Sequence, residues 1–237
     1  MAKQTGIGAN LYANQYNISG DVGAIDTLAT SRTLIDVTDI EDDAPSRLPG
    51  IADGMLGFTG YFDRDAGHVH DALGSAFGTA QVQLTASLGT AIGDAAASVL
   101  AQKASYTTTR GQDGSLAVAV QASSSGGYGL DWGRLLNARA SATGTASTTV
   151  DNGAASSNGA TGYLHITAVA AGTPTVIVQH APDNATWATL TGLSFTASST
   201  ATYEFKTTAA GLTVDRYLRY NVTGGTATFA LNVVRNP

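Results

Sequence analysis

The sequence predicts a mainly β protein with one helix, on three observations. Runs with apolar side chains at alternate positions recur along most of the chain, as in half-buried strands. Glycine, proline, asparagine and aspartate separate these runs, which is typical of turns between strands. Only residues 68–77 place apolar side chains at helical spacing, with Val69, Ala72, Leu73 and Ala76 on one face.

The first part of the chain combines strands with this helix. Its clearest alternation lies in residues 54–63, and the turn residues Gln112, Asp113 and Gly114 predict a hairpin. Residues 94–102 are assigned to a strand, although their alanines favour a helical turn. Further strands are expected over residues 11–20, 25–40, 81–89, 99–110 and 114–123.

The second part is β almost throughout. Alternation is regular in residues 162–169 and 173–180, and it recurs in residues 217–222 and 227–234. Six or more short strands in about 90 residues predict a C-terminal β-sandwich, placed at residues 159–237. Turns are expected at residues 171–172, 182–184 and 224–225.

A stretch of small polar residues, 141–158, separates the two parts. Its composition is typical of a flexible connector, an irregular loop or a weak strand. We therefore expect a first domain over residues 1–140, with an N-terminal arm over about residues 1–10. Residues 141–158 would be a linker or poorly regular stretch before the sandwich.

Charge and cysteine content exclude several classes of function. Only 13% of the residues are charged, against about 25% in ordinary soluble proteins. The net charge of -6, with all of the acidic excess before residue 140, argues against binding nucleic acid through its phosphates. The absence of cysteine excludes disulfides, thiol catalysis and thiolate metal sites. We also expect no export signal and no membrane insertion, since no apolar run approaches the roughly 20 residues of a membrane span.

The strongest candidate metal cluster is formed by His68 and His70 with Asp63, Asp65 and Asp71. In a strand the two imidazoles would share a face, but on a helix residues two apart point in nearly opposite directions. We therefore interpret this cluster as a helix cap with surface polar groups and predict no metal site.

No catalytic constellation is present. The chain contains no nucleophile elbow, no phosphate-binding loop and no dinucleotide fingerprint. His165 and His180 have no carboxylate or hydroxyl at motif spacing and are expected to be partly buried strand residues. We expect no enzyme activity and no cofactor.

Two further groups are candidates for binding other molecules. Glu41, Asp42 and Asp43, with Arg47, lie in a predicted exposed loop that lacks the ligand spacing of a calcium site. This loop is a candidate contact between subunits. Trp187 and Tyr203 are candidates for an aromatic platform for a glycan, although the stronger interpretation of Trp187 is that it covers one end of the sandwich.

Five segments of the first part resemble the major tail tube proteins of long, non-contractile-tailed (siphovirus-type) bacteriophages. They are residues 10–40, 44–63, 68–76, 110–122 and 128–136. The resemblance spans about residues 1–140. The second part is similar in architecture to the immunoglobulin-like or jelly-roll sandwich domains that many such virion proteins carry at the C-terminus.

The resemblance implies a tail-tube β-barrel or sandwich domain with one flanking helix. Six subunits would form a ring, and stacked rings would form a tube through which DNA passes without specific binding. A negative lumen would repel the DNA phosphates. Residues 54–63 and 114–123 are candidates for the inner wall, and the predicted loop from Ile40 to Ala52 for the contact with a neighbouring subunit or ring.

The implied partners are further copies of the chain and other tail proteins, namely the tape measure, terminator and distal tail proteins. The implied location is the virion tail, after synthesis in the host cytoplasm. The alternative is a capsid decoration or adhesin protein whose C-terminal sandwich binds cell-surface glycans.

Overall fold

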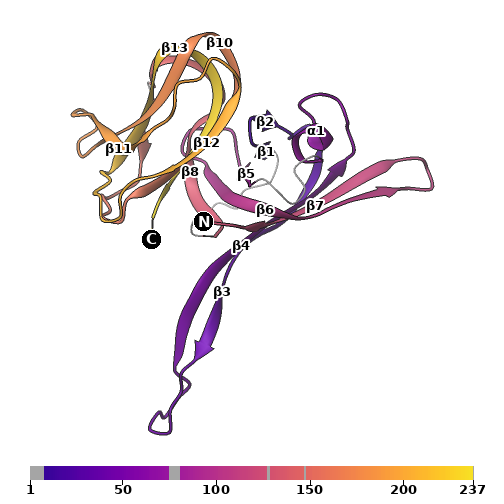
Figure 1. The fold of residues 1–237 in the computed structure, drawn as a ribbon. Helices are drawn as coiled ribbons and strands as arrows, with labels where there is room; N and C mark the ends of the chain where they lie inside the picture. The colour runs from indigo at the N-terminus through magenta and orange to yellow at the C-terminus, as the bar shows by residue number, and fades with distance from the viewer. Residues whose placement is uncertain (1–7, 75–80, 127–128, 147, 237) are drawn as a thin grey trace.

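The computed structural model describes residues 8–74, 81–126, 129–146 and 148–236. It confirms the mainly β prediction, because the regular structure of these residues consists of thirteen strands and one short helix, α1 (Val69–Leu73) (Figure 1). The strands are β1 (Asn10–Ala13), β2 (Tyr16–Asn17), β3 (Val22–Asp36), β4 (Arg47–Tyr61), β5 (Val82–Ser87), β6 (Ala95–Arg110), β7 (Leu116–Ser124), β8 (Asp131–Thr145), β9 (Val150–Asp151), β10 (Ala160–Ala181), β11 (Ala188–Ser194), β12 (Thr202–Thr207) and β13 (Tyr217–Arg235).

Hydrogen bonds link the strands into one sheet with the central order β11-β10-β13-β8-β6-β5-β1-β2. The sheet branches at β6, which also pairs with β7, and β7 continues through β4 to β3. Two apolar cores form on it. The first core contains buried side chains between residues 11 and 130, including Phe58 and Leu84. The second contains buried side chains between residues 136 and 233, including Leu164 and Phe229.

Strand β8 crosses the expected domain boundary. Its first residues, Asp131–Arg134, pair with β6, and its later residues, up to Thr145, pair with β13. Residues 141–145 of the expected linker are therefore part of a strand. The division of the chain into two domains stays a prediction.

The turns predicted at residues 171–172 and 224–225 are wrong. Both positions lie inside long strands, β10 and β13, which pair with each other along almost their whole length. Gly172 and Gly224 have φ angles of +69° and +78°, and the register shifts beside Gly172. Glycine with positive φ bends a strand at a bulge as readily as it reverses a chain. The paired strands arch over the second core as a result (Figure 1).

The predicted helix is confirmed over Val69–Leu73, and its expected end at residues 75–77 lies outside the described residues. The helix begins where an Asp21 carboxylate oxygen accepts the backbone N–H of Val69 at 2.8 Å. The side chain of His68, the residue before the helix, makes no capping hydrogen bond. Within the described ranges, no helix is long and apolar enough to cross a membrane.

Strands β6 and β7 confirm two other predictions. They form a hairpin around the turn at residues 111–115, where Gly114 has a φ of +90°. The alanine-rich start of β6 is a strand because it pairs with both β5 and β8, so tertiary pairing outweighs the helical propensity of alanine.

Strand β5 is buried on both faces. Its apolar residues Val82, Leu84 and Ala86 belong to the first core. Its polar residues, Gln83 and Thr85 among them, face away from that core and are fully buried. They lie against the second half of the chain, because Gln83 donates a hydrogen bond to the carbonyl oxygen of Leu164 at 3.0 Å. A polar seam therefore joins the two cores.

His165 occupies the centre of this seam and is completely buried. Its Nδ1 donates to the carbonyl oxygen of Asn14, and its Nε2 lies 2.8 Å from the hydroxyl of Thr85. Thr85 is 2.7 Å from Ser98, which accepts from the amide nitrogen of Asn232 at 2.8 Å. The amide nitrogen of Gln83, which can only donate, lies 3.2 Å from the same Nε2, so Nε2 accepts and His165 is neutral with its proton on Nδ1. Burial lowers the pKa of His165 to about 4.

Candidate assembly surface

Strands β3 and β4 form a long hairpin that projects away from the rest of the protein (Figure 1). Strand β3 pairs only with β4, and β4 pairs with β7 only from Met55 onward. Among the described strands, none pairs with the outer edges of residues 31–53, which are called the projecting hairpin from here on. The hairpin leaves the body at Gly54, where a Cβ atom would lie 2.1 Å from the backbone nitrogen of Leu130. A glycine is needed there for the close approach of the two backbones.

The projecting hairpin carries a concentration of exposed apolar side chains and buries none of its residues. Ile40 and Ile51 are 101% and 91% exposed, and Leu34, Ile35 and Leu48 are all more than half exposed. A two-stranded hairpin without a core is at best marginally stable in water. Unpaired strand edges next to exposed apolar side chains mark a surface that pairs with another chain.

The tip of the hairpin, residues 37–46, is held by bonds between its own side chains and backbone. Asp36 accepts from the backbone N–H and the hydroxyl of Thr38, which lowers the pKa of the Asp36 carboxyl. Asp39 accepts from the N–H of Glu41 at 2.8 Å, and Ser46 donates its N–H to Thr38 at 2.9 Å. The tip therefore presents a defined shape.

The predicted contact residues lie on this hairpin. Glu41, Asp42 and Asp43 are exposed at the tip, and Arg47 is the first residue of β4. Among the described residues, none of the four forms an ion pair. They remain a predicted contact.

The loop predicted from Ile40 to Ala52 is wrong from residue 47 onward, because residues 47–52 belong to β4. Pro49, a residue type that is rare inside strands, pairs with Leu34 next to a register shift. Proline is tolerated there because the outer edge of a hairpin needs no further N–H donor.

Most of the acidic excess of the chain lies on the projecting hairpin, which has six acidic residues and two arginines. The two segments expected to form an inner wall, residues 54–63 and 114–123, are neighbours, since β4 pairs with β7 from Met55 to Tyr61. The acidic hairpin is thus a direct extension of this paired region.

The two aromatic residues of the glycan prediction lie in different surroundings. Trp187 is partly buried beneath Arg219, whose guanidinium carbon is 4.0 Å from the ring centre. Tyr203 is 37% exposed and lines a hollow of about 290 Å³ with Glu204 and Thr196. Trp187 is not part of this hollow. The described residues therefore show no shared platform for the two rings.

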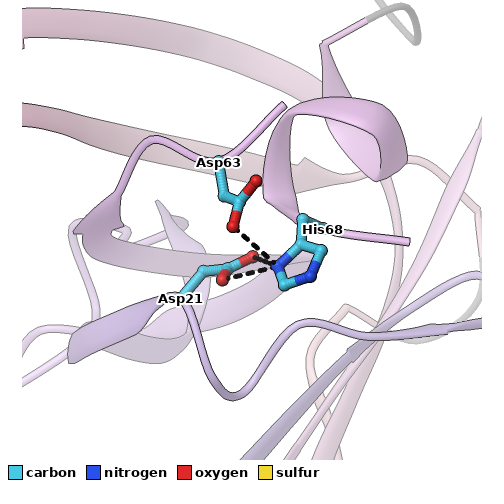
Figure 2. A group of neighbouring side chains, drawn as sticks. All are labelled: Asp21, Asp63 and His68. Atoms are coloured by element: carbon cyan, nitrogen blue, oxygen red, sulfur yellow. Dashed lines mark hydrogen bonds and ion pairs between the residues drawn. The ribbon is translucent and has the colours of Figure 1, made fainter. Parts of the chain in front are cut away.

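The structure brings together Asp63 and His68 from the predicted cluster and adds Asp21, which the sequence analysis missed (Figure 2). Hydrogen bonding to Asp21 raises the pKa of His68. His70 turns to a different partner, the hydroxyl of Tyr106 at 3.0 Å. No spacing signal could identify Asp21, because 47 residues separate it from His68.

The other two histidines are strand residues, as expected, with different environments. His165 is completely buried in the polar seam, where only partial burial was expected. His180 on β10 pairs with Asp215 at 2.9 Å.

Comparison with protein-family models found no match, and a search of curated proteins found no relative. Among solved structures, the chain is similar to a component of the virion of a native gene transfer agent particle, with a TM-score of 0.40 and 14% identity over 54% of this chain and 98% of that one. It is also similar to the Dit protein of phage SPP1, from a hub adsorption apparatus, with a TM-score of 0.35 and 10% identity over 96% and 99% of the chains. A third similar chain is in the activated phage P2 baseplate with Ca, with a TM-score of 0.36 and 10% identity over 98% and 99%.

Proposed function

We propose that the protein is a structural virion subunit that assembles with copies of itself into the stacked rings of a phage tail tube. The observation that carries this proposal is the projecting hairpin, with free strand edges and exposed apolar side chains. The resemblance of residues 1–140 to tail tube proteins supports the choice of tube. The hairpin would pack against a neighbouring subunit or ring, and other tail proteins would contact the ends of the tube.

Self-assembly accounts for two properties that are unfavourable in a monomer. Closing strands across subunits covers the edges of β3 and β4, which otherwise invite aggregation, and rings that stack head to tail can extend into a tube. Interface cores are also poor in charge, and the exposed apolar side chains of Leu34, Leu48 and Ile51 would supply such a core on the hairpin. The acidic hairpin would place negative charge along the tube and repel the phosphates of passing DNA.

The double substitution Ile40→Asp and Ile51→Asp tests the proposal. Both side chains are almost fully exposed, so the monomer should fold normally, whereas the assembled interface would have to bury two carboxylates. If each isoleucine contributes about 2 kcal/mol to association, replacing both should lower the association constant by about three orders of magnitude. Light scattering after size exclusion and negative-stain electron microscopy should show monomers in place of rings or tubes.

Tyr203→Asp serves as the control, because Tyr203 is also a large, partly exposed residue, 37% exposed, but lies on β12, outside the projecting hairpin and the expected inner wall. This variant should assemble as the unmodified protein does. Normal tubes from the double variant, or monomers from the unmodified protein at all concentrations, would contradict the proposal.

Charge at the tip is tested separately by Asp42→Lys with Asp43→Lys. The tip is acidic and exposed, so reversing two charges is expected to impair tube assembly while circular dichroism shows a folded chain. Asp42→Asn with Asp43→Asn should have a smaller effect because it removes charge without reversing it. Normal tubes from the lysine variant would show that the tip is not an assembly contact.

A glycan-binding decoration or adhesin protein is the alternative. Trp187 and Tyr203 occupy separate surroundings, so the alternative lacks the aromatic platform on which it was based. Monodisperse monomers or trimers together with glycan binding that Trp187→Ala abolishes would favour it.

A further inference from the structure

Three side chains from separate segments converge at the end of the β3–β4 pair that is opposite the projecting hairpin (Figure 2). Asp21 immediately precedes β3, Asp63 follows β4, and His68 precedes α1. Asp21 Oδ1 and Asp63 Oδ2 lie 2.9 Å and 3.2 Å from the same atom, Nδ1 of His68. The backbone also holds this arrangement, because Tyr61 donates its N–H to the carbonyl oxygen of Asp21 at 2.7 Å.

In this cluster the hydrogen-bond acceptors outnumber the available hydrogens, and the negative charge of the carboxylates is not fully balanced by positive groups. Nδ1 of His68 carries at most one hydrogen, yet three oxygens from the two carboxylates lie within 3.2 Å of it. Within the described part of the chain, no lysine or arginine forms an ion pair with Asp21 or Asp63. Two carboxylates and one imidazolium leave a net negative charge, and Asp21 is 7% exposed. A buried carboxylate requires a compensating charge.

We propose that Asp21, Asp63 and His68 bind a divalent transition-metal ion of the zinc type. The bound ion would take the place of the shared hydrogen, with His68 neutral and Nδ1 as its ligand atom. Two charges on the metal would balance the two carboxylates. This proposal is independent of the tail-tube function.

The orientation of the ligands fits such an ion. Asp63 uses Oδ1 to accept the N–H of Asp65 at 2.9 Å and directs Oδ2 at His68. Asp21 Oδ2 accepts the N–H of Val69, and Oδ1 approaches His68. Backbone donors of this kind orient metal-binding carboxylates. Ligand separations of 2.9 Å and 3.2 Å are close to the roughly 3.3 Å edges of a tetrahedron with bonds of about 2.0 Å.

The donor set and the exposure of the cluster define the class of metal. One imidazole nitrogen with two carboxylates suits zinc and its neighbours, whereas calcium requires about six to eight oxygen ligands. The side chains of His68 and Asp63 are 44% and 37% exposed. A metal ion can therefore enter from solvent, and water can complete the coordination. The bound ion would tie the start of β3, the segment after β4 and α1 together.

The test uses the full-length chain without an affinity tag, treated with EDTA and then dialysed. Titration calorimetry with zinc chloride at neutral pH is expected to show about one ion per chain, and zinc should raise the melting temperature. Calcium chloride should do neither. His68→Ala and Asp63→Asn should each weaken zinc binding at least about tenfold, the scale on which even the outer partners of a metal site act.

His180→Ala is the matched control, because it removes a histidine that pairs with a single carboxylate elsewhere, Asp215 at 2.9 Å. This variant should bind zinc as the unmodified protein does. Absence of zinc binding, or unchanged affinity in Asp63→Asn, would overturn the proposal. Asp21→Asn is a poorer variant, because Asp21 also accepts the first N–H of α1. Zinc binding is measured without reference to assembly, so either proposal can fail alone.

Discussion

Replacing Phe229 by alanine is expected to lower the free energy of unfolding by about 3–5 kcal/mol. Phe229 is completely buried in the second core and lies edge-on to Tyr220, with ring centres 5.2 Å apart. The substitution removes the apolar contacts of the ring and leaves a cavity that the paired strands β10 and β13 restrict from collapsing. Urea unfolding of the monomer, followed by circular dichroism, measures the change.

Ile40→Ala is the matched comparison, since Ile40 is another large apolar residue but is fully exposed at the tip of the projecting hairpin. The free energy of unfolding of the monomer should change by no more than about 0.5 kcal/mol. A large destabilisation by Ile40→Ala would show that the hairpin folds back onto the body. A small one by Phe229→Ala would show that the second core is not packed as described.

Acidification from about pH 7 to about pH 4.5 is expected to remove about 2–3 kcal/mol of stability through His165 alone. Its pKa falls from 6.5 in the unfolded chain to about 4 in the folded protein because of burial. Between these two pKa values the unfolded chain therefore binds a proton at His165, whereas the folded protein does not. The contribution of His165 to stability is complete above about pH 6.5 and is lost as the pH falls toward 4.

Comparison with His165→Gln isolates this contribution, because the raised pKa values of His68 and Asp131 act in the opposite direction in both proteins. The free energy of unfolding, measured by urea at several pH values, should depend less on pH in His165→Gln between about pH 4 and 6.5. An identical dependence in His165→Gln would show that folding does not lower the pKa of His165.

The local fold was largely predictable, whereas its long-range geometry was not. Alternation identified the segments that became β4, β7 and β10, and the spacing of Val69, Ala72 and Leu73 identified the helix. The same glycine signals that predicted turns at residues 171–172 and 224–225 produced bulges, because a positive φ serves both structures. Local sequence cannot show which one the pairing partner selects.

The candidate sites were predictable only in part for the same reason. The exposed position of Glu41, Asp42 and Asp43 follows from their charge and from the neighbouring prolines. The convergence of Asp21 with His68 depends on the pairing of Val22 with Gly60, which brings the start of β3 next to the end of β4. The burial of Gln83 and Thr85 was also hidden, because alternating polar residues in a strand are typical of a face exposed to water.

The polar face of β5 has a consequence for how such a protein can gain or lose parts. If the chain ended before β10, Gln83 and Thr85 would exchange their present partners for water, and among their neighbours the ring of Tyr12, 5.6 Å from that of His165, would lose its cover. Small changes in how the two halves fit together would be tolerated there too, since water can bridge polar groups that do not contact each other directly. Strand β5 therefore presents to the second half a face whose polar groups water can satisfy, so separating the two halves would cost less there than at a purely apolar contact.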